Sequence, residues 1–370
     1  MNKIVKKKVL MVACNGLGNG GVQNVMMNLV RKMSFQYDFD MLLFVAEREY
    51  YDDEFEKYGN IYRIPNKKMR VDYYIRFFRI FCGTYKLLKK NKYDIIHCNN
   101  EYESGICLLA AFLAKVKIRV VHSHVVFNLQ IDNPIRKMLN KFYKLLLNKC
   151  STNRVSCSQE SGESIYSKNF EVVVNPIDLK LFDVRKRKKR EGNSINFVHV
   201  GKFYEIKNQV FIVDTMSIVK NKISNVTLTL VGCGDEYKEK IESAIIKHNL
   251  KDVVEFLPHD ADIPEVLANS DYMIFPSKKE GLGIALLEAQ AMGVYCFAST
   301  GVPVEANAGL CEFLDLNLGH KIWAERIVDY IKNEEKKIHA QNIGDYSIEI
   351  ACSKIKEIYQ GEKLILKARG

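Results

Sequence analysis

Short apolar runs alternate with longer amphipathic stretches along most of this chain, and this alternation limits the folds open to it. The run "KKVLMVAC" is typical of a buried strand. The segment "VQNVMMNLVRKM" that follows it has apolar residues at 22, 25, 26, 29, 30 and 33, which is the spacing of one helix face. The same order recurs several times, which predicts a parallel sheet with helices on both faces.

A second alternation of the same kind begins at Ile195, and 370 residues are enough for two domains. We expect two doubly wound, Rossmann-like α/β domains at residues 1–182 and 195–345, facing each other across a central cleft. A linker at 183–194 would join them, because Arg185 to Arg190 are six consecutive basic residues. A nuclear-localisation or lipid-binding role for that run is the alternative. Residues 346–370 are expected to form a helical tail.

The composition narrows the class of protein. A formal net charge of +11 favours acidic partners such as nucleic acid, phosphorylated small molecules or anionic lipid. We expect no signal peptide and no membrane span, because no stretch of about 18 uncharged apolar residues occurs. The ten cysteines are scattered and form no C-x-x-C pair, which favours a reduced, cytoplasmic protein without a zinc site.

Gly16, Gly18 and Gly21 have the G-x-G-x-x-G spacing of dinucleotide-binding domains, directly after the first expected strand. Such a domain also needs an acidic residue at the end of its second strand, and the candidate Glu47 lies farther along the chain than the usual spacing. The glycines suit a loop whose backbone approaches a ligand ahead of a helix equally well. An NAD-dependent oxidoreductase that uses these glycines is therefore the alternative function.

The segment "FPSKKEGLGIALLEAQAMG" carries the strongest functional signal. A strand leads into it, and a helix is expected to begin near Ile284. Gly281 and Gly283 allow the backbone to approach a ligand, and the first N–H groups of the helix can bind a phosphate. Glu280 and Glu288 flank this anion site, where a carboxylate can accept two hydrogen bonds from a vicinal diol such as ribose.

Positive charge for a diphosphate is supplied by "HVGKFYEIKNQ", which contains the loop after the first strand of the second domain. Lys202 and Lys207 present compact cations to phosphate oxygens. Two acids and two lysines around one phosphate site suit a sugar nucleotide, with one acid on the ribose and the other on the sugar.

These segments resemble those of a known family. "EGLGIALLEAQAMG" is similar to the E-x₇-E motif of family 4 of the retaining nucleotide-sugar glycosyltransferases, and "GKFYEIKNQ" resembles its phosphate loop. "LTLVGCGDEYKEKI", "VVNPIDLKLF" and "GNGGVQNVMMNL" resemble its second glycine turn, its domain junction and its N-terminal glycine loop. The match spans nearly the whole chain and looks closest to enzymes of bacterial capsule and exopolysaccharide assembly. It implies the GT-B fold, with the C-terminal helix returning toward the N-terminal domain.

The resemblance also implies a role for each matching residue. Glu288 would hold the ribose, Glu280 would lie by the donor-sugar hydroxyls, and His124 would line the cleft near that sugar. Lys202 and Lys207 would neutralise the diphosphate. The other expected donor-binding positions are Gly20, Gly21, Gly232, Gly281, Leu282, Gly283 and Ile284.

Two positions depart from the family's pattern. Lys202 stands where the family usually has Arg, so a bidentate phosphate contact is lost there. Pro176 replaces the usual Gly of the junction, which we expect to alter the hinge only.

Two patterns that bind metals in other proteins are interpreted differently here. His122 and His124 alternate along an expected strand and have no further ligands nearby in the sequence pattern, so a structural role is the alternative for His124. The D-x-D pairs at 38–40 and 260–262 are interpreted as turn and cap residues. Catalysis is therefore predicted to use no metal and no cofactor, with the lysines and a helix end stabilising the leaving diphosphate.

The predicted function is transfer of a hexosyl unit, with retention, from a nucleotide sugar that we expect to be a UDP-sugar. The expected acceptor is a lipid-linked oligosaccharide or glycan in capsular or exopolysaccharide biosynthesis. The aromatic and basic segment 71–92 predicts contact with the anionic inner face of the cell membrane, and an ordinary amphipathic helix is the alternative. A non-catalytic binding protein is a further alternative, but no basic–aromatic nucleic-acid motif supports one for nucleic acid.

Overall fold

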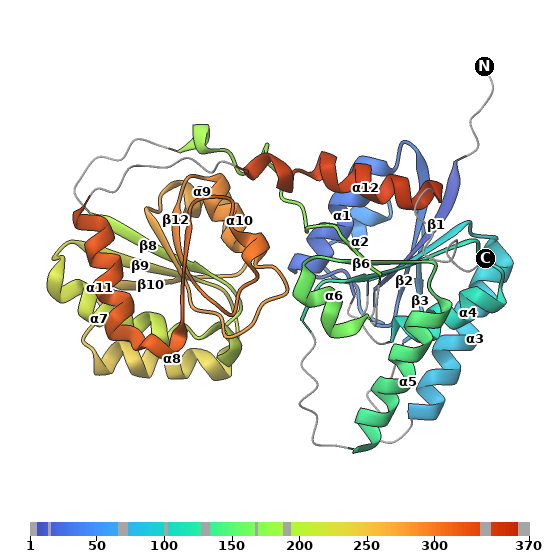
Figure 1. The fold of residues 1–370 in the computed structure, drawn as a ribbon, viewed down its shortest axis with the longest axis horizontal. Helices are drawn as coiled ribbons and strands as arrows, with labels where there is room; N and C mark the ends of the chain where they lie inside the picture. The colour runs from blue at the N-terminus through green and yellow to red at the C-terminus, as the bar shows by residue number, and fades with distance from the viewer. Residues whose placement is uncertain are drawn as a thin grey trace. The chain divides into compact units, whose positions relative to one another are not determined.

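The computed structural model describes residues 6–13, 16–65, 73–99, 103–126, 134–166, 169–187, 194–333 and 342–361. These residues form two compact units, each built on its own sheet (Figure 1). Unit 1 comprises the described residues up to Pro176 and those from Ile348 onward, and unit 2 is Ile177–Ser347. Residues 71–72 of the expected membrane helix, residues 188–193 of the expected linker and the chain beyond residue 361 lie outside the described residues.

Unit 1 contains a seven-stranded sheet in the order β3-β2-β1-β4-β5-β6-β7. All of its strand pairs are parallel, as the alternating sequence predicts. Its elements are β1 (Lys7–Ala13), α1 (Gly21–Met33), β2 (Tyr37–Leu43), α2 (Asp52–Phe55), β3 (Ile61–Arg63), α3 (Tyr73–Asn91), β4 (Ile95–Cys98), α4 (Ser104–Leu113), β5 (Ile118–Ser123), α5 (Pro134–Cys150), β6 (Asn153–Ser156), α6 (Gln159–Ile165), β7 (Glu171–Val172) and α12 (Ile348–Gln360).

The register of the central strands brings two polar residues to one edge of this sheet. Cys98, the last residue of β4, pairs with Val12 of β1 and with Val121 of β5. Because the strands are parallel, the residues that follow them emerge together at the carboxyl edge, where ligands of such sheets bind. Asn99 follows β4 at once, and His124 follows β5 at once.

The helix α12 belongs to unit 1, although it follows unit 2 in the sequence. It packs beside α1 (Figure 1), and its buried Ile355 and Tyr359 face the core. The Tyr359 hydroxyl lies 2.7 Å from Nδ1 of His97 on β4, and the Tyr359 carbonyl accepts a bond from Lys7. These contacts attach the C-terminal helix to the central strands of the first sheet.

Unit 2 contains a six-stranded parallel sheet in the order β10-β9-β8-β11-β12-β13. Its elements are η1 (Val184–Lys186), β8 (Ile195–Val200), η2 (Glu205–Lys207), α7 (Gln209–Lys222), β9 (Val226–Val231), α8 (Asp235–Lys247), β10 (Val254–Leu257), α9 (Ile263–Ala268), β11 (Tyr272–Phe275), α10 (Ile284–Ala291), β12 (Tyr295–Ser299), η3 (Val304–Ala306), β13 (Cys311–Leu314), η4 (Leu316–Leu318), α11 (Gly319–Lys332) and η5 (Ile343–Tyr346).

The core of unit 2 is anchored by Trp323 of α11, which is fully buried. Its ring meets Phe211 of α7 edge to face, with the centroids 5.2 Å apart, and its indole N–H donates to the carbonyl of Asp315. An aromatic side chain of this size contributes a large apolar surface, and the hydrogen bond satisfies its one polar atom.

β7 contains only Glu171 and Val172, and the chain then reaches Pro176, which has no N–H for the ladder. One segment differs from the sequence interpretation. Arg187, expected in a solvated linker, donates to the carbonyls of Gly293 and Ser270 and so packs on unit 2.

No helix among the described residues is both long and apolar enough to span a bilayer. The nine cysteines in the described part of the chain are free thiols, and Cys14 lies outside it.

The loops that follow β8 and β9 touch each other through their backbones, and a glycine makes this contact possible. A Cβ at Gly232 would lie 2.2 Å from the carbonyl oxygen of Gly201, a distance that real Cβ atoms do not reach. The amide of Phe203 donates to the carbonyl of Cys233 across the same junction. The loop that carries Lys202 and Lys207 is therefore braced by its neighbour.

Gly232→Ala should destabilise the protein by about 1–3 kcal/mol, because the added methyl group must displace backbone atoms. Gly344→Ala is the matched control, since a Cβ there meets nothing within 4 Å. Chemical denaturation followed by circular dichroism measures both variants, and an equal effect of the two substitutions would contradict the close contact.

Candidate active site

The loop after β11 is fixed by backbone contacts on both of its sides. The amide of Lys278 donates to the carbonyl of Ile206, and the amide of Glu280 donates to the carbonyl of Gly301. The hydroxyl of Ser299 donates to the carbonyl of Ser277. The loop is thus held between η2 and the turn after β12 by hydrogen bonds within the chain.

Helix α10 begins where this loop ends, as the sequence predicts. Gly283 is its N-cap in the left-handed region, with φ +90°, and offers no side chain to the first helical amides. The first turn contains no acidic residue. The helix start therefore presents N–H groups and the positive end of the helix dipole without a competing carboxylate in that turn.

Lys207 and Glu280 form an ion pair, although 73 positions separate them in the sequence. Both side chains are largely buried, with relative exposures of 23% and 11%. The Lys207 ammonium also lies 5.8 Å from the centre of the Phe275 ring, at a distance where a cation–π attraction operates. Lys202 of the same loop is exposed, and none of the described residues forms an ion pair with it.

The buried His199 is linked through Gln209 to the loop that carries Lys202 and Lys207. His199 at the end of β8 lies 3.0 Å from the carbonyl of Ile274 through Nδ1, and its Nε2 faces the amide nitrogen of Gln209. Burial lowers the pKa of His199 to about 4, so the ring is neutral at pH 7 and donates through Nδ1 while accepting at Nε2. Gln209 also donates to the carbonyl of Lys202. His199 is therefore structural, as is common for a buried histidine.

Glu288 lies on α10, a little over one turn from its start. Its side chain is partly exposed, and no described residue gives its carboxylate a hydrogen bond or an ion pair. The protein around it removes much of the surrounding water, which raises the pKa of Glu288 to about 7. An unpaired carboxylate in such surroundings is a functional-site candidate, since a ligand hydroxyl could satisfy it.

The acid that lies against the N-terminal glycine loop of unit 1 is Glu49 rather than Glu47. The Glu49 carboxylate lies against Gly16, where a Cβ would meet Glu49 Oε2 at 2.3 Å. Burial raises the pKa of Glu49, and the charge of Asp52 adds to the effect. Glu47, the acid weighed for a dinucleotide ribose, is exposed. Gly20 is the N-cap of α1, and Gly21 is its first residue.

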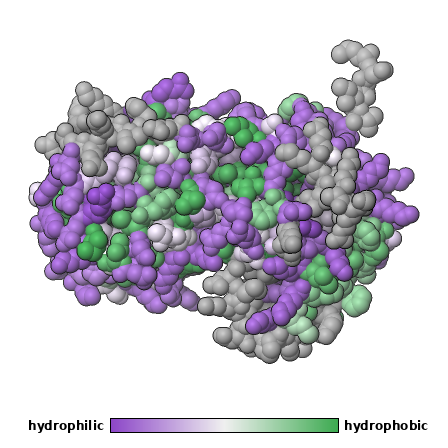
Figure 2. Space-filling model, in the orientation of Figure 1, coloured by the Kyte–Doolittle hydropathy of each residue, from purple (hydrophilic) through white to green (hydrophobic). Residues whose placement is uncertain are grey.

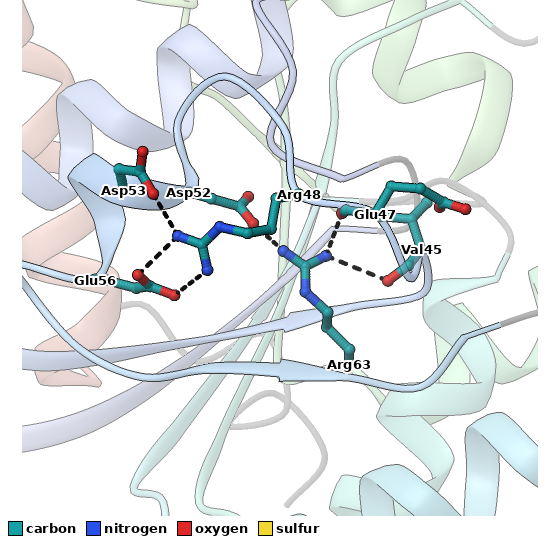
Figure 3. Close-up of polar contacts among 7 residues, drawn as sticks. All are labelled: Val45, Glu47, Arg48, Asp52, Asp53, Glu56 and Arg63. Carbon is teal, nitrogen blue, oxygen red and sulfur yellow. Dashed lines mark hydrogen bonds and ion pairs between the residues drawn. The ribbon is translucent and has the colours of Figure 1, made fainter.

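The segment after β2 is held by two arginines (Figure 3). Arg48 pairs with Asp53 and Glu56, and all three side chains are exposed. Arg63 pairs with the fully buried Asp52 and also donates to the backbone carbonyls of Glu47 and Val45. The backbone of Glu47, the acid weighed for the dinucleotide alternative, thus takes part in securing this loop.

His124 is 4% exposed, and both of its ring nitrogens have partners. Nδ1 lies 3.0 Å from Oδ1 of Asn175, and Nε2 lies 3.1 Å from Oδ1 of Asn99. Burial lowers the pKa of His124 to about 4. No role was expected for either asparagine. Asn99 follows β4 directly, and Asn175 comes three residues after the end of β7.

The D-x-D pairs serve local structure. The Asp262 side chain caps α9, as expected, by accepting a bond from the amide of Glu265. Asp40 lies within β2 rather than in a turn, and it accepts bonds from Tyr93 and Asn60. The described residues contain no group of three or more His, Cys, Asp or Glu side chains arranged to hold a metal ion.

The predicted site residues fall into two sets, one in each unit. Unit 2 brings together Glu280 and Lys207, with Glu288 on the helix that follows the same loop. Further members of this set are Lys202 and Gly232 in the loops after β8 and β9, and Gly281, Leu282, Gly283 and Ile284 before and at the start of α10. His124, Gly20 and Gly21 belong to unit 1.

Two family models match this chain, one over most of each half. The family model "Glycosyltransferase Family 4" matches residues 19–181, and "Glycosyl transferases group 1" matches residues 182–345. The capsular polysaccharide biosynthesis glycosyltransferase CapH of Staphylococcus aureus is 26% identical over 362 residues, which is 94% of this chain and 97% of that protein. A Bacillus subtilis protein named as glycosyltransferase EpsF is 30% identical over 342 residues, or 87% of each chain.

Two further similarities concern substrates of other proteins. An Escherichia coli UDP-Gal:α-D-GlcNAc-diphosphoundecaprenol α-1,3-galactosyltransferase is 28% identical over 305 residues, covering 74% of this chain and 77% of that enzyme. Among solved structures, Anabaena HepE in complex with UDP and glucose has a TM-score of 0.79 at 18% identity, covering 96% of this chain and 99% of that one.

The two matched families together span both units, and the fold is that of GT-B glycosyltransferases. None of these relatives is a dinucleotide oxidoreductase, so the alternative function has no support. This chain belongs to the group 1 glycosyltransferases of family 4 and is a glycosyltransferase.

Proposed function

We propose that this enzyme transfers a hexosyl unit from a UDP-sugar, with retention and without a metal, to a lipid-linked glycan acceptor in capsular or exopolysaccharide assembly. One observation carries the proposal. The Lys207–Glu280 ion pair lies beside the start of α10, and the same helix carries the unpaired Glu288. Unit 2 thus contains a cation and helix-start amide groups for a diphosphate, and two acids for the hydroxyls of a nucleoside diphosphate sugar.

The diphosphate would be bound by Lys207, Lys202 and the first amides of α10. Lys207 is already held at the loop by Glu280, so little side-chain entropy is lost when a phosphate oxygen joins it. The helix end adds roughly half a positive charge. These groups are equally placed to stabilise the charge that grows on the leaving diphosphate, which is why we propose catalysis without a metal.

The two acids would divide the recognition of the donor. Glu288 accepts hydrogen bonds from the ribose diol, and Glu280 from the hydroxyls of the sugar. The E-x₇-E spacing resembles that of a retaining family, and retention is proposed on this ground. The leaving phosphate oxygen would accept the proton of the acceptor hydroxyl as the new glycosidic bond forms and the sugar–phosphate bond breaks.

The names of the relatives support a UDP-sugar as the donor and a lipid-linked glycan as the acceptor. UDP is bound by HepE, and UDP-Gal and a diphosphoundecaprenol-linked sugar are named for the E. coli galactosyltransferase. CapH is named for capsular polysaccharide biosynthesis. An acceptor attached to a lipid would place the enzyme at the cytoplasmic face of a membrane.

Unit 1 has a surface that fits such a location, formed by α3 and α5. Neither helix contains an acidic residue, while their sequences carry several Lys and Arg residues. Phe78 and Met138 are each 62% exposed, and Phe77 and Phe142 contact each other between the two helices. Figure 2 shows apolar and hydrophilic atoms close together over this part of unit 1. Exposed apolar side chains among cations suit an anionic lipid surface.

Lys207→Ala should lower the transfer rate from a UDP-sugar by about 10²–10³-fold, because one preorganised cation is lost from the leaving group. Lys220→Ala on the outer surface of α7 is the matched control and should leave the rate unchanged. The donor is first chosen by a screen of UDP- and GDP-sugars for protection against thermal unfolding. The assay contains EDTA. Unchanged transfer by Lys207→Ala, or a strict need for added Mg²⁺, would contradict the proposal.

The affinity for the same UDP-sugar should fall by about tenfold as the pH falls from 8 to 6. The raised pKa of Glu288, about 7, means that its carboxylate is mostly ionised at the upper pH and mostly protonated at the lower one. Protonation turns one of the two acceptor oxygens into an O–H donor and removes the charge, so the protonated acid binds the ribose diol more weakly. Isothermal titration of wild type and Glu288→Gln tests this. The variant should bind more weakly at pH 8 and show a flat profile, and an unaltered profile would argue against the ribose contact.

The α3–α5 surface should bind vesicles that contain anionic phosphatidylglycerol at low salt, and should release them at high salt. The double variant Phe78→Ser with Met138→Ser should weaken this binding, because inserted apolar area is lost. Phe35→Ser, at a side chain that is 68% exposed in the turn after α1, is the control. Equal co-sedimentation of all three proteins would show that another surface, or none, contacts lipid.

A further inference from the structure

The imidazole of His124 is shared between two carboxamides and leaves no ring nitrogen for a substrate. Asn175 lies 3.0 Å from Nδ1, and Asn99 lies 3.1 Å from Nε2. All three side chains are at least 96% buried, with exposures of 4% for His124 and Asn99 and 3% for Asn175. A hydrogen bond to a sugar hydroxyl would therefore require one of these contacts to break.

The two contacts also specify the position of the ring proton. A neutral imidazole donates from one nitrogen and accepts at the other, whereas a carboxamide can present either its oxygen or its amino group. The amino group of Asn99 makes a long contact of 3.4 Å with the carbonyl of His97, which turns its oxygen toward His124. Nε2 then carries the proton and donates to Oδ1 of Asn99. A neutral ring must accept at Nδ1, so we assign the Asn175 carboxamide the flipped orientation, in which its amino group takes the place of the Oδ1 that lies 3.0 Å from Nδ1.

The ring is kept neutral by its other neighbours. The His122 ring lies next to it, tilted by 32° with the centroids 4.0 Å apart, and the His97 ring stacks on His122 with the centroids 5.5 Å apart. Burial lowers the pKa of His97 to about 3 and that of His122 well below its usual value. The Tyr359 hydroxyl of α12 contacts His97, at the end of this row of three histidine rings that is farther from Asn99 and Asn175. A charged His124 would stand beside uncharged rings without water, which disfavours protonation.

The contacts between His124 and the two asparagines matter because of where these asparagines lie in the chain. Asn99 directly follows β4, and His124 directly follows β5. Asn175 immediately precedes Pro176, the last residue of the first segment of unit 1. A single ring thus connects the carboxyl edge of the central sheet to the point where the chain leaves the unit.

We propose that His124 is a positioning residue. Its neutral imidazole holds Asn99 and Asn175 in place, and so fixes the beginning of the connection to unit 2 at the edge of the sheet where we expect ligands to bind. This role differs from a direct contact with the donor sugar, near which His124 is expected to lie. The consequence for turnover rests on the proposed function, whereas the arrangement of protons does not.

The proton arrangement is tested by nuclear magnetic resonance of the protein with ¹⁵N-labelled histidine rings, assigned with His124→Gln. We expect His124 to show a protonated Nε2 and an unprotonated Nδ1, unchanged from pH 8 to pH 5.5. Asn175→Asp offers only acceptors to Nδ1, so in this variant His124 should take up a second proton and titrate at a higher pH than in wild type. Asn333→Asp, on the exposed end of α11, is the control and should change nothing.

The proposal would be overturned if His124 of the wild type titrated near pH 6.5 or carried its proton on Nδ1. This resonance experiment needs no substrate. The second arm compares turnover by His124→Ala, Asn175→Ala and the double variant. A positioning role predicts similar losses in kcat for all three, because each breaks the same bridge. A direct sugar contact predicts a raised KM for His124→Ala and a much smaller effect of Asn175→Ala. Absence of any transfer by the wild type would count against the proposed function alone.

Discussion

The account depends above all on the ion pair between Lys207 and Glu280. Two charges of opposite sign, brought from different loops, are kept together at 23% and 11% exposure before any ligand is present. Such a pair costs desolvation energy and contributes little to stability by itself. Its value in a transferase is that the cation and the acid are already oriented, so a diphosphate and a sugar can each meet a prepared partner.

The surrounding fold explains how this pair is positioned. Parallel strands place their following loops at one edge, and the loops after β8, β9, β11 and β12 brace each other there through backbone hydrogen bonds and close glycine contacts. The neutral His199 supports the lysine loop from inside the sheet. In unit 1 the neutral His124 is likewise buried at the carboxyl edge of its own sheet, where it contacts two asparagines.

Local patterns allowed much of this to be predicted. The helix Gly21–Met33 and the helix start at Ile284 follow from apolar spacing and from glycines, which act over a few residues. The package of Glu280, Gly283 and Glu288 lies within one short segment, so its phosphate-site character could be inferred from the sequence. The resemblance to a family then supplied the reaction class.

Contacts between distant segments were not accessible in the same way. Nothing in the sequence indicates that Lys207 meets Glu280, or that His124 lies between Asn99 and Asn175, because each contact depends on strand register and loop course. The spacing rule for a dinucleotide site likewise led to Glu47, while in the fold Glu49 lies against the glycine loop and the Glu47 carbonyl accepts from Arg63.

Whether unit 2 binds the nucleotide where these residues gather is the central claim. A crystal structure of the protein with UDP tests it most directly. The account predicts the diphosphate at the amides that begin α10 and at the ammonium of Lys207, with the ribose hydroxyls on Glu288. UDP bound at another place, such as the glycine loop of unit 1 alone, or no bound UDP at saturating concentration, would contradict it.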